Sequence, residues 1–318
     1  MGSQRCVFTV SGRSVADPDI DLIIRPGTVM TPEEFCGLDG PAIGLDGAVS
    51  GAPFRRPGGP HASYNHHESV DRYSTRSTCE QCYLDVSQGL WLRMHRGGHP
   101  GADVYVNDAD EDVCTALWVL ANPRRINELA VRRLVEVEGI LDVLAATWWP
   151  EWAEIDDMLA HLAWVYGPCH DARRDAQPAD EESLRAIIEE VAERITAHVN
   201  GSGGRRAAST EYVPVLQRGA VAVVREYGPY ARMQERLDGL ETVISERWAG
   251  TVRIVSITKT TPWSSTDLAT VYRRLNELEG CPPDDQWGGS DLVGGSPRRR
   301  GTSLSLETIL DVVASSGP

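Results

Sequence analysis

The stretch VYVNDADEDVCTALWVLAN, residues 104–122, indicates the fold class. Its first three residues, 104–106, are apolar and typical of a buried strand. After an acidic run, Val113, Leu117 and Leu120 recur at helical spacing. A strand that passes directly into a helix is the elementary unit of α/β proteins. We therefore expect a mixed fold of the α/β class.

The sequence on either side of this stretch extends the same pattern. Before it, CVFTV at 6–10 and DLIIRP at 21–26 resemble short strands, and residues 38–60 resemble a long loop because Gly, Pro and Asp are frequent there. After it, apolar residues at helical spacing predict three helices. These helices are expected at 124–146, 154–166 and 183–199.

The last third of the chain changes character after NGSGGRRAAST, residues 200–210. This short segment of small residues is the best candidate for a flexible domain boundary. Beyond it, β-rich runs alternate with short helical patterns. We expect strands at 215–227 and 251–259, and helices at 231–247, 266–279 and 305–314. The sequence thus predicts an α/β domain with a helical middle at 1–200, followed by a smaller α+β substrate-binding domain at 211–318.

Composition narrows the function classes. The formal net charge is −15, and such an acidic surface repels the phosphates of long nucleic acids and anionic lipids. No apolar run is long enough to span a membrane, and the N-terminus lacks the pattern of a secretory signal. The seven cysteines are scattered and do not form a disulfide pattern. We therefore expect a cytoplasmic protein with reduced thiols.

The segment HASYNHHESVDR, residues 61–72, is the first half of a predicted metal site. It contains three of the eight histidines, His61, His66 and His67, and also Glu68. Histidine is the commonest metal ligand in proteins, and a nearby carboxylate completes such a site or orients a ring nitrogen. This segment therefore predicts ligands for a divalent metal.

The acidic run at 108–112 is the second half of the predicted metal site. Carboxylates gathered at the end of a strand repel one another unless a cation lies between them. Asp108 and Asp110 share a face in an extended segment, whereas Glu111 and Asp112 suit the N-terminus of the following helix. The Asp46-Gly47 pair also offers a carboxylate, although Asp-Gly is commonly a turn.

At these residues the sequence resembles the DHH phosphoesterase superfamily, which is metal-dependent. Asn65-His66-His67 resembles that family's Asp-His-His signature, with Asn65 in the place of the aspartate. Residues 107–113 resemble its Asp-x-Asp motif, although the two motifs occur in the opposite order. The resemblance implies that Asp108, Asp110 and His67 bind manganese or magnesium. It also implies that His66 lies close to the scissile phosphate.

The segment WGGSDLVGGSPRRR, residues 287–300, resembles the glycine-rich substrate loop of the same family. Independently of the resemblance, glycines allow backbone amides to approach an anion, and serine and arginine side chains donate to phosphate or carboxylate. The alternative is a glycine-rich surface loop with a basic tip. The substrate-binding candidates are Ser290, Gly294, Gly295, Ser296 and Arg298.

In addition to His66, His161 is a candidate catalytic residue. It lies four residues after Asp157 on a predicted helix, so the imidazole and the carboxylate share one face. Such a pair can act as a general base and the group that orients it. An ion pair on the helix surface is the simpler interpretation.

Three function classes fit these observations, and we rank a metal-dependent hydrolase of a small phosphorylated or nucleotide substrate first. Its cofactor would be manganese or magnesium. The second is a non-heme iron oxygenase that uses two histidines and one carboxylate on a small ring-containing metabolite. The third is a non-catalytic ligand-binding protein. All three take a small-molecule ligand, and the sequence leaves the substrate, the metal and the oligomeric state open.

Overall fold

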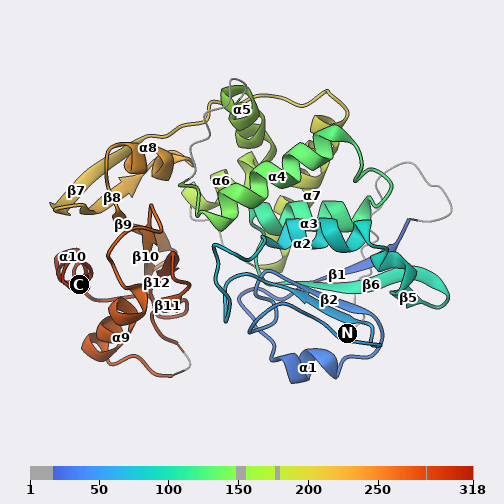
Figure 1. Ribbon diagram of the computed structural model, residues 1–318, viewed down its shortest axis with the longest axis horizontal. Coiled ribbons are helices and arrows are strands. Elements are labelled where there is room, and N and C mark those ends of the chain that lie inside the picture. The colour runs from blue at the N-terminus through green and yellow to red at the C-terminus, as the bar shows by residue number, and fades with distance from the viewer. Residues whose placement is uncertain (1–16, 148–154, 176–179, 284, 318) are drawn as a thin grey trace.

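The structure, a computed structural model, describes residues 17–147, 155–175, 180–283 and 285–317. Two sheets, each packed against helices, confirm the expected mixed α/β class (Figure 1). One sheet is built from residues 19–106 and the other from residues 212–295. We call residues 17–200 the N-terminal unit and residues 211–317 the C-terminal unit. Within the described residues, no helix has the length and apolar character needed to cross a membrane.

The first sheet has the strand order β1-β6-β2-β4-β3, with β5 paired to β6. The strands β1, β6, β2 and β4 are parallel neighbours, and β3 runs antiparallel at the edge. Parallel strands end at the same edge of a sheet, and such an edge is where α/β proteins place their sites. The bounds are β1 Asp19–Ile24, β2 Ala42–Leu45, β3 Phe54–Arg55, β4 His61–Tyr64, β5 His95–Arg96 and β6 His99–Val106.

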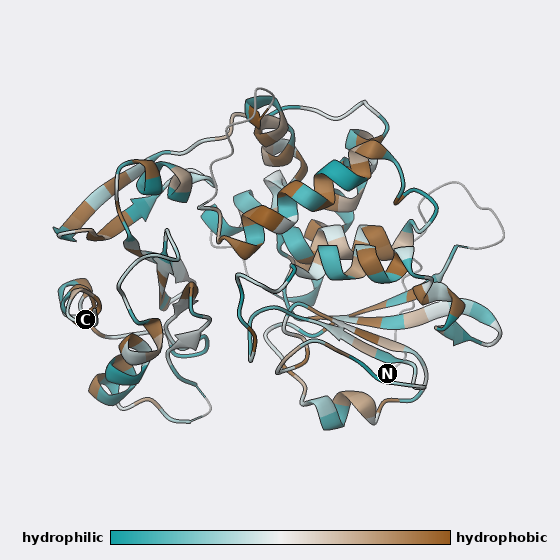
Figure 2. Cartoon of the chain, viewed as in Figure 1, coloured by the Kyte–Doolittle hydropathy of each residue, from teal (hydrophilic) through white to brown (hydrophobic). Residues whose placement is uncertain are grey.

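A layer of helices covers one face of this sheet, and its apolar side chains form the largest core (Figures 1 and 2). The short helix α1, Pro32–Cys36, lies on the opposite face, where Phe35 packs with Met30, Val49 and Tyr105. The bounds in the helical layer are α2 Thr78–Ser87, α3 Glu111–Ala121, α4 Leu129–Val143, α5 Ile155–Val165, α6 Gly167–Arg174 and α7 Glu181–Val199; the 3-10 helix η1 is Leu90–Leu92.

The second sheet has the strand order β11-β12-β10-β9-β8-β7 and is antiparallel except for the parallel pair β8 and β9. Helices α9 and α10 pack on it, with Leu275 and Ile309 wholly buried between the layers. The bounds are β7 Tyr212–Arg218, β8 Val221–Glu226, α8 Ala231–Leu237, β9 Thr242–Ala249, β10 Val252–Lys259, α9 Leu268–Glu279, β11 Gly288–Gly289, β12 Val293–Gly295 and α10 Leu306–Ala314.

Several predicted elements are confirmed, namely β1, β6, α3, α5, α7, β10, α9 and α10. The loop predicted at 38–60 is wrong, because its short apolar run 42–45 forms β2 in the centre of the sheet. The helix predicted at 231–247 is wrong in its second half, which forms β9. The strand predicted at 6–10 lies outside the described residues.

The segment 200–210, predicted as a flexible boundary, has neither helix nor strand but is attached to the helical layer. Arg206 forms two hydrogen bonds with the carboxylate of Asp171, and its backbone amide donates to Ala160. Gly204 lies so close to Trp164 that an added Cβ would meet the indole at 2.6 Å. The expected free hinge is therefore replaced by a fixed connection.

Candidate metal centre

His66 lies at the centre of a buried group of carboxylates beyond the carboxyl ends of β2 and β4. Its side chain has no exposed surface. Its Nε2 atom lies 2.7 Å from Oδ2 of Asp142, 3.5 Å from Oδ1 of Asp46 and 3.9 Å from Oδ2 of Asp112. Ligands at about 2.1 Å from one cation are roughly 3 Å from one another. These atoms form two overlapping groups that could hold a cation and that share His66: one with Asp46 and His67, the other with Asp112 and Asp142.

The closest pair in this group, His66 and Asp142, is an ion pair when the imidazole is protonated. Nε2 of His66 and Oδ2 of Asp142 are both buried, and neither has a hydrogen-bond partner although they are 2.7 Å apart. Buried polar atoms are rarely left without a partner, because the loss of hydration is not compensated. Two such atoms at this distance need a proton or a cation to compensate their burial, so the pair could take part in holding a metal ion.

Asp46 joins the group from the turn after β2. It has a positive φ of 46° and is followed by Gly47, so the turn predicted for Asp-Gly and the predicted carboxylate occur together. Its Oδ1 atom accepts a hydrogen bond from the hydroxyl of Thr78 and lies 2.9 Å from Nε2 of His67. The left-handed backbone thus directs this carboxylate toward the two histidines.

Asp112 lies in the first turn of α3 and is almost fully buried. Its two carboxylate oxygens accept the backbone N–H groups of Thr78 and Cys79, each at 2.7 Å, at the start of α2. A carboxylate offers about four acceptor positions, so these two bonds leave capacity for a cation. Asp112 lies in the first turn of α3, as predicted, and its two hydrogen bonds show that it also binds the N-terminus of α2.

The electrostatics of the group combine opposing effects: burial disfavours the charged forms of Asp46 and Asp142, but neighbouring positive charges outweigh it and lower the pKa of both carboxyls. Burial raises the pKa of Asp112 to about 7, and the charges of Asp142 and Asp46 contribute. Burial, together with the charge of Asp46, raises the pKa of Asp110 well above its usual range. Burial opposes the protonated form of His66, but Asp142 outweighs it and raises its pKa to about 10. A divalent cation would neutralise this repulsion.

Arg72 fixes the geometry of the group from inside the protein, since only 4% of its side chain is exposed. It donates to the side chain of Asp142 and to the backbone carbonyls of Asp142 and Val143. It also donates to Nδ1 of His67 at 2.7 Å. A guanidinium has no acceptor, so Nδ1 must carry the lone pair, and neutral His67 carries its proton on Nε2. His67 therefore acts as a hydrogen-bond donor, and Asp46, His66, Asp112 and Asp142 are the best ligand candidates.

Two arginines of the C-terminal unit bind the segment just beyond the end of α4. Arg232 on α8 donates to the carbonyl of Ala145, and Arg236 donates to the carbonyl of Thr147. The last carbonyls of a helix lack partners within it and favour positive charge. Because α4 carries Asp142 close to its end, α8 links the C-terminal unit to the position of a candidate ligand.

His61 is a correction to the predicted metal ligands. It lies in β4, where alternate side chains point to opposite faces of the sheet. Its ring packs against Phe35 on the α1 face, and its Nε2 atom bonds with the carbonyl of Leu38. Glu68 is also outside the group: its carboxylate accepts the amide of Gly51 on the surface.

Asp108 is exposed, and its carboxylate accepts the amide of the next residue, Ala109. Asp110 caps α3 by accepting the amide of Val113, although its charge interacts with that of Asp46. The two predicted ligands therefore border the metal group and are not within it. Of the two histidines to which the resemblance assigned roles, His66 is buried and His67 has 34% of its side chain exposed.

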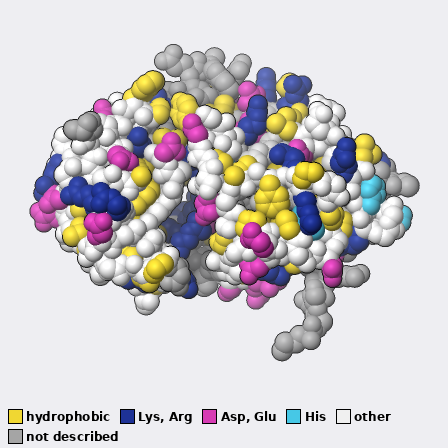
Figure 3. Space-filling view, turned by 60° about the horizontal axis from the view of Figure 1, so that its bottom comes forward, with side chains coloured by type: hydrophobic (Ala, Val, Ile, Leu, Met, Phe, Trp, Pro, Cys, Tyr) yellow, Lys and Arg dark blue, Asp and Glu magenta, His cyan; other side chains and the backbone are white. Residues whose placement is uncertain are grey.

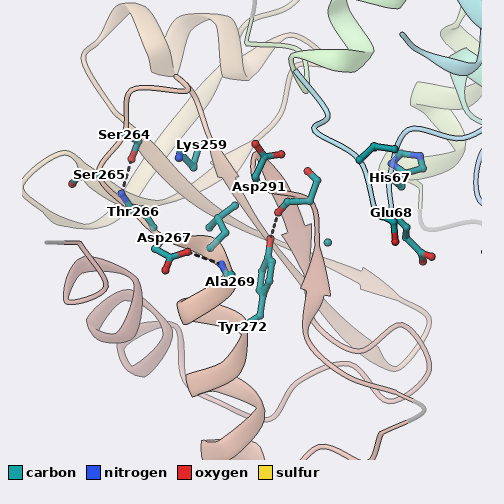
Figure 4. Close-up of a pocket in the computed structure, with 15 residues that line it drawn as sticks. His67, Glu68, Lys259, Ser264, Ser265, Thr266, Asp267, Ala269, Tyr272 and Asp291 are labelled. Atoms are coloured by element: carbon teal, nitrogen blue, oxygen red, sulfur yellow. Dashed lines mark hydrogen bonds between the residues drawn. The ribbon is translucent and has the colours of Figure 1, made fainter. Parts of the chain in front are cut away.

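A cavity of about 760 Å³ lies between the two units, and His67 forms part of its wall (Figure 4). From the N-terminal unit it is lined by residues 67–70, which include Glu68. From the C-terminal unit it is lined by the start of α9, the end of β10 and the turn that contains Ser290. The predicted substrate loop thus reaches the side of the metal centre through Ser290.

Other residues of the predicted substrate loop have structural roles. Ser296 is buried, and its hydroxyl accepts the amide of Val255. Gly294 and Gly295 form β12, where an added Cβ would meet Tyr272 Oη at 2.1 Å and the Val255 carbonyl at 2.6 Å, respectively. These glycines are needed for close packing, which corrects their assignment to anion binding.

Arg298 is exposed and belongs to a group of arginines from both units. Burial lowers the pKa of Arg247 on β9, and the positive charges of Arg173 and Arg298 lower it further, whereas Asp108 opposes them. Like charges that converge beside a metal group favour an anionic ligand. Figure 3 shows Lys or Arg side chains in the hollow between the two halves of the molecule.

His161 is a correction to the predicted catalytic residues. Its Nδ1 atom bonds with the carbonyl of Gly204, and its ring lies 5.2 Å from that of His198. The carboxylate of Asp157 lies 3.7 Å from Nε2, as expected for a surface pair. His161 is part of neither the metal group nor the cavity wall, and it fixes the connection between the units.

The sequence prediction did not include Asp142 or Arg72 as site residues, and it named Asp112 only for the start of a helix. The signal for Asp142 is its spacing from Glu138, because these two acids lie four residues apart on α4. Glu138 is buried within an otherwise apolar face of α4. Asp142 follows one turn later on the same face, and two acids in such a position indicate polar groups in the protein interior. Nothing in the local sequence distinguishes Arg72 from a surface arginine.

Comparisons with known proteins identify no family for this chain. The chain matches no protein-family model, and no curated protein and no solved structure shows significant similarity to it.

Proposed function

We propose that this protein is a divalent-metal-dependent hydrolase that acts on a small phosphorylated substrate. The observation that carries this proposal is the buried pair of His66 Nε2 and Asp142 Oδ2, which have no hydrogen-bond partner and lie among the further carboxylates of Asp46 and Asp112. Oxygen-rich groups of this kind suit manganese or magnesium. Bound cations would polarise a phosphoryl group and lower the pKa of a bound water.

The charges around the metal group support a phosphorylated substrate. Arg173 on α6 and Arg247 on β9 come from different units, and Arg298 follows β12. Guanidinium groups recognise phosphate with paired hydrogen bonds, and they stabilise charge on its oxygens. The carboxylates would hold the cations, and Arg247 and Arg298 would hold the anion, because Arg173 is already paired with both carboxylate oxygens of Glu111.

His67 supplies a proton donor at the edge of the metal group. Arg72 keeps its Nδ1 atom as an acceptor, so Nε2 carries a proton beside Asp46. His67 also forms part of the cavity wall, where a substrate would approach. A donor in this position can bond to a phosphoryl oxygen or to the leaving group.

A non-heme iron oxygenase is the second candidate. Asp46, His66 and His67 have the composition of its facial triad. The triad requires a lone pair on Nε2 of His67, but Arg72 occupies Nδ1 and leaves the proton on Nε2. Two further carboxylates also exceed what a triad needs. The geometry therefore supports the hydrolase better.

Metal content and hydrolysis test this proposal together. We expect the purified protein to bind manganese, and to hydrolyse the generic substrate bis(p-nitrophenyl) phosphate only with a divalent cation. Asp142→Asn should reduce metal affinity at least about 100-fold, because even substitutions outside the ligand set typically cost 10- to 100-fold. Asp157→Asn removes an exposed carboxylate and serves as the control. Bound iron with oxygen-dependent turnover would favour the oxygenase, and an Asp142→Asn variant with unchanged metal affinity would contradict the site.

A further inference from the structure

Lys259 is the only lysine in the chain, in which the 31 basic residues are otherwise arginines. It is the last residue of β10 and lines the cavity between the two units. Many of the arginines are engaged in ion pairs, such as Arg173 with Glu111 and Arg206 with Asp171. Among the described residues, the side chain of Lys259 has no ion pair and no hydrogen bond. Its charge is therefore available to a ligand in the cavity.

The carboxylates of the same cavity have other partners. Glu68 accepts the amide of Gly51. Asp267 caps α9, where it accepts the amide of Ala269 and the hydroxyl of Thr270. These hydrogen bonds, and to a smaller extent the charge of Lys259, lower the pKa of Asp267. Asp291 is exposed on the turn between β11 and β12. These contacts leave the ammonium group of Lys259 without a partner at hydrogen-bonding distance.

The position of Lys259 relative to the metal centre is the second observation. Lys259 and His67 lie on opposite walls of one cavity of about 760 Å³ (Figure 4). His67 is also 2.9 Å from Asp46, so this wall continues into the metal group. A molecule that reaches the metal group through the cavity would extend toward Lys259. The cavity volume is within the usual range for small-molecule sites.

We infer that Lys259 binds a second anionic group of the substrate, so that the substrate carries one phosphoryl group at the metal centre and another phosphate or a carboxylate at the far wall of the cavity. This inference rests on the proposed function only for the phosphoryl group at the metal centre, and the anion site at Lys259 is argued independently. A lysine binds such a group as a compact positive charge with three donors. The hydroxyl of Ser265, which lines the same cavity and has no hydrogen-bond partner within the described residues, offers a further donor.

The single lysine makes a direct test possible. Reductive methylation with isotope-labelled methyl groups keeps the positive charge, and it gives one side-chain resonance besides that of the N-terminal amine. We expect this resonance to shift and saturate when inorganic phosphate or acetate is added to the magnesium-loaded protein. Sodium chloride at the same ionic strength should not produce this shift. The relative affinities of phosphate and acetate identify the kind of anionic group.

Variants complete the test by calorimetric titration with the better of the two anions. Lys259→Gln should weaken binding in the cavity by about tenfold or more, as expected for loss of one charge-assisted contact. Lys259→Arg should restore part of it. Arg273→Gln is the matched control, because it removes one positive charge from the exposed face of α9 and should leave binding unchanged.

The outcomes separate this inference from the proposed function. A resonance that responds to chloride as it does to phosphate and acetate would overturn the anion site, even in a protein that hydrolyses phosphodiesters with manganese. A saturable shift that Lys259→Gln weakens, in a protein that binds no metal, would support the anion site and leave the proposed hydrolase without support.

Discussion

Nε2 of His66 lies 2.7 Å from Oδ2 of Asp142, and this contact joins the loop after β4 to the end of α4. Because both atoms are buried, a proton or the cation that we propose must compensate their loss of hydration. The parallel sheet positions the histidine, and the helical layer positions the carboxylate. The proposed metal centre would therefore depend on correct packing of the helices on the sheet.

His66→Gln should abolish tight metal binding, because it replaces the imidazole at the centre of the ligand group. The loss of manganese affinity should be at least about 100-fold, beyond the 10- to 100-fold that outer-shell changes cost. His61→Gln is the control, since His61 packs on Phe35 on the other face of the sheet. Equilibrium dialysis with manganese measures both. If both variants lose manganese affinity equally, the loss comes from disruption of the sheet and not from removal of a metal ligand.

Arg72→Gln should weaken metal binding without removing a ligand. The substitution removes donors to Asp142 and His67, so both side chains lose their fixed orientation. We expect manganese affinity to fall about 10- to 100-fold, as for other groups that orient ligands. The pH dependence of turnover should also change, because Nδ1 of His67 is no longer held as an acceptor. Arg76→Gln, which breaks an exposed pair with Glu80, should change neither quantity.

Glu235 should make the stability of the protein depend on pH. Its carboxylate is buried without a hydrogen-bond partner, and burial together with the charge of Glu226 raises its pKa from 4.5 to about 8. The folded state therefore holds this proton more tightly than the unfolded state. Its stabilising contribution is complete below pH 4.5 and is lost as pH rises to about 8.

Urea unfolding at pH 6 and at pH 9 measures this effect. We expect the native protein to lose about 2–3 kcal/mol between these values from Glu235, at 1.36 kcal/mol for each pH unit up to its pKa. Glu235→Gln should lack that loss, because the amide does not ionise. Glu277→Gln on the exposed face of α9 is the control and should retain it. The same pH dependence in the Glu235→Gln protein would assign the titration to another group.

Gly294→Ala should destabilise the C-terminal unit. Its Cβ would meet Tyr272 Oη at 2.1 Å and the carbonyl of Gly288 at 2.4 Å, so side chain and backbone would have to shift. Overpacking of this kind typically costs about 1–3 kcal/mol. Gly288→Ala is the matched control in the same hairpin, because nothing lies within 4 Å of its added Cβ. Denaturant unfolding compares the two, and similar stability would show that the Gly294 site can relax.

The sequence predicted the strand-to-helix unit at 104–122 because hydrophobic spacing alone specifies it. It also placed His66 and His67 in one group, since neighbouring ligands need no knowledge of the fold. It missed β2 because a run of four residues among Gly and Asp resembles a loop. Only parallel pairing with β4 and β6 makes that run a central strand.

The distant members of the site could not be predicted from local patterns. Asp46, Asp112 and Asp142 come from a turn and two helices, and only the packing of α3 and α4 brings them to the histidines. An acidic residue that caps a helix and one that binds a cation have the same local sequence. Asp108 and Asp110 precede α3 and bind local backbone amides, whereas Asp112, in the first turn of α3, lies in the group with His66 and Asp142.

Arg298→Ala should impair substrate binding and leave the metal centre intact. Arg298 is exposed, and its charge acts on Arg247, which also interacts with Asp108 beside the metal group. Its loss removes one charge-assisted contact to an anion and should cost about 1.5–3 kcal/mol, roughly tenfold to hundredfold in kcat/KM. We expect the loss in kcat/KM to come mostly from a higher KM, because such a contact positions the substrate and takes no part in proton transfer. Manganese content should equal that of the native protein. Arg273→Ala removes the same charge from an exposed helix face and should leave kcat/KM unchanged. If both variants lower kcat/KM equally, the arginines act through net charge alone, and Arg247 and Arg298 do not form a specific phosphate site.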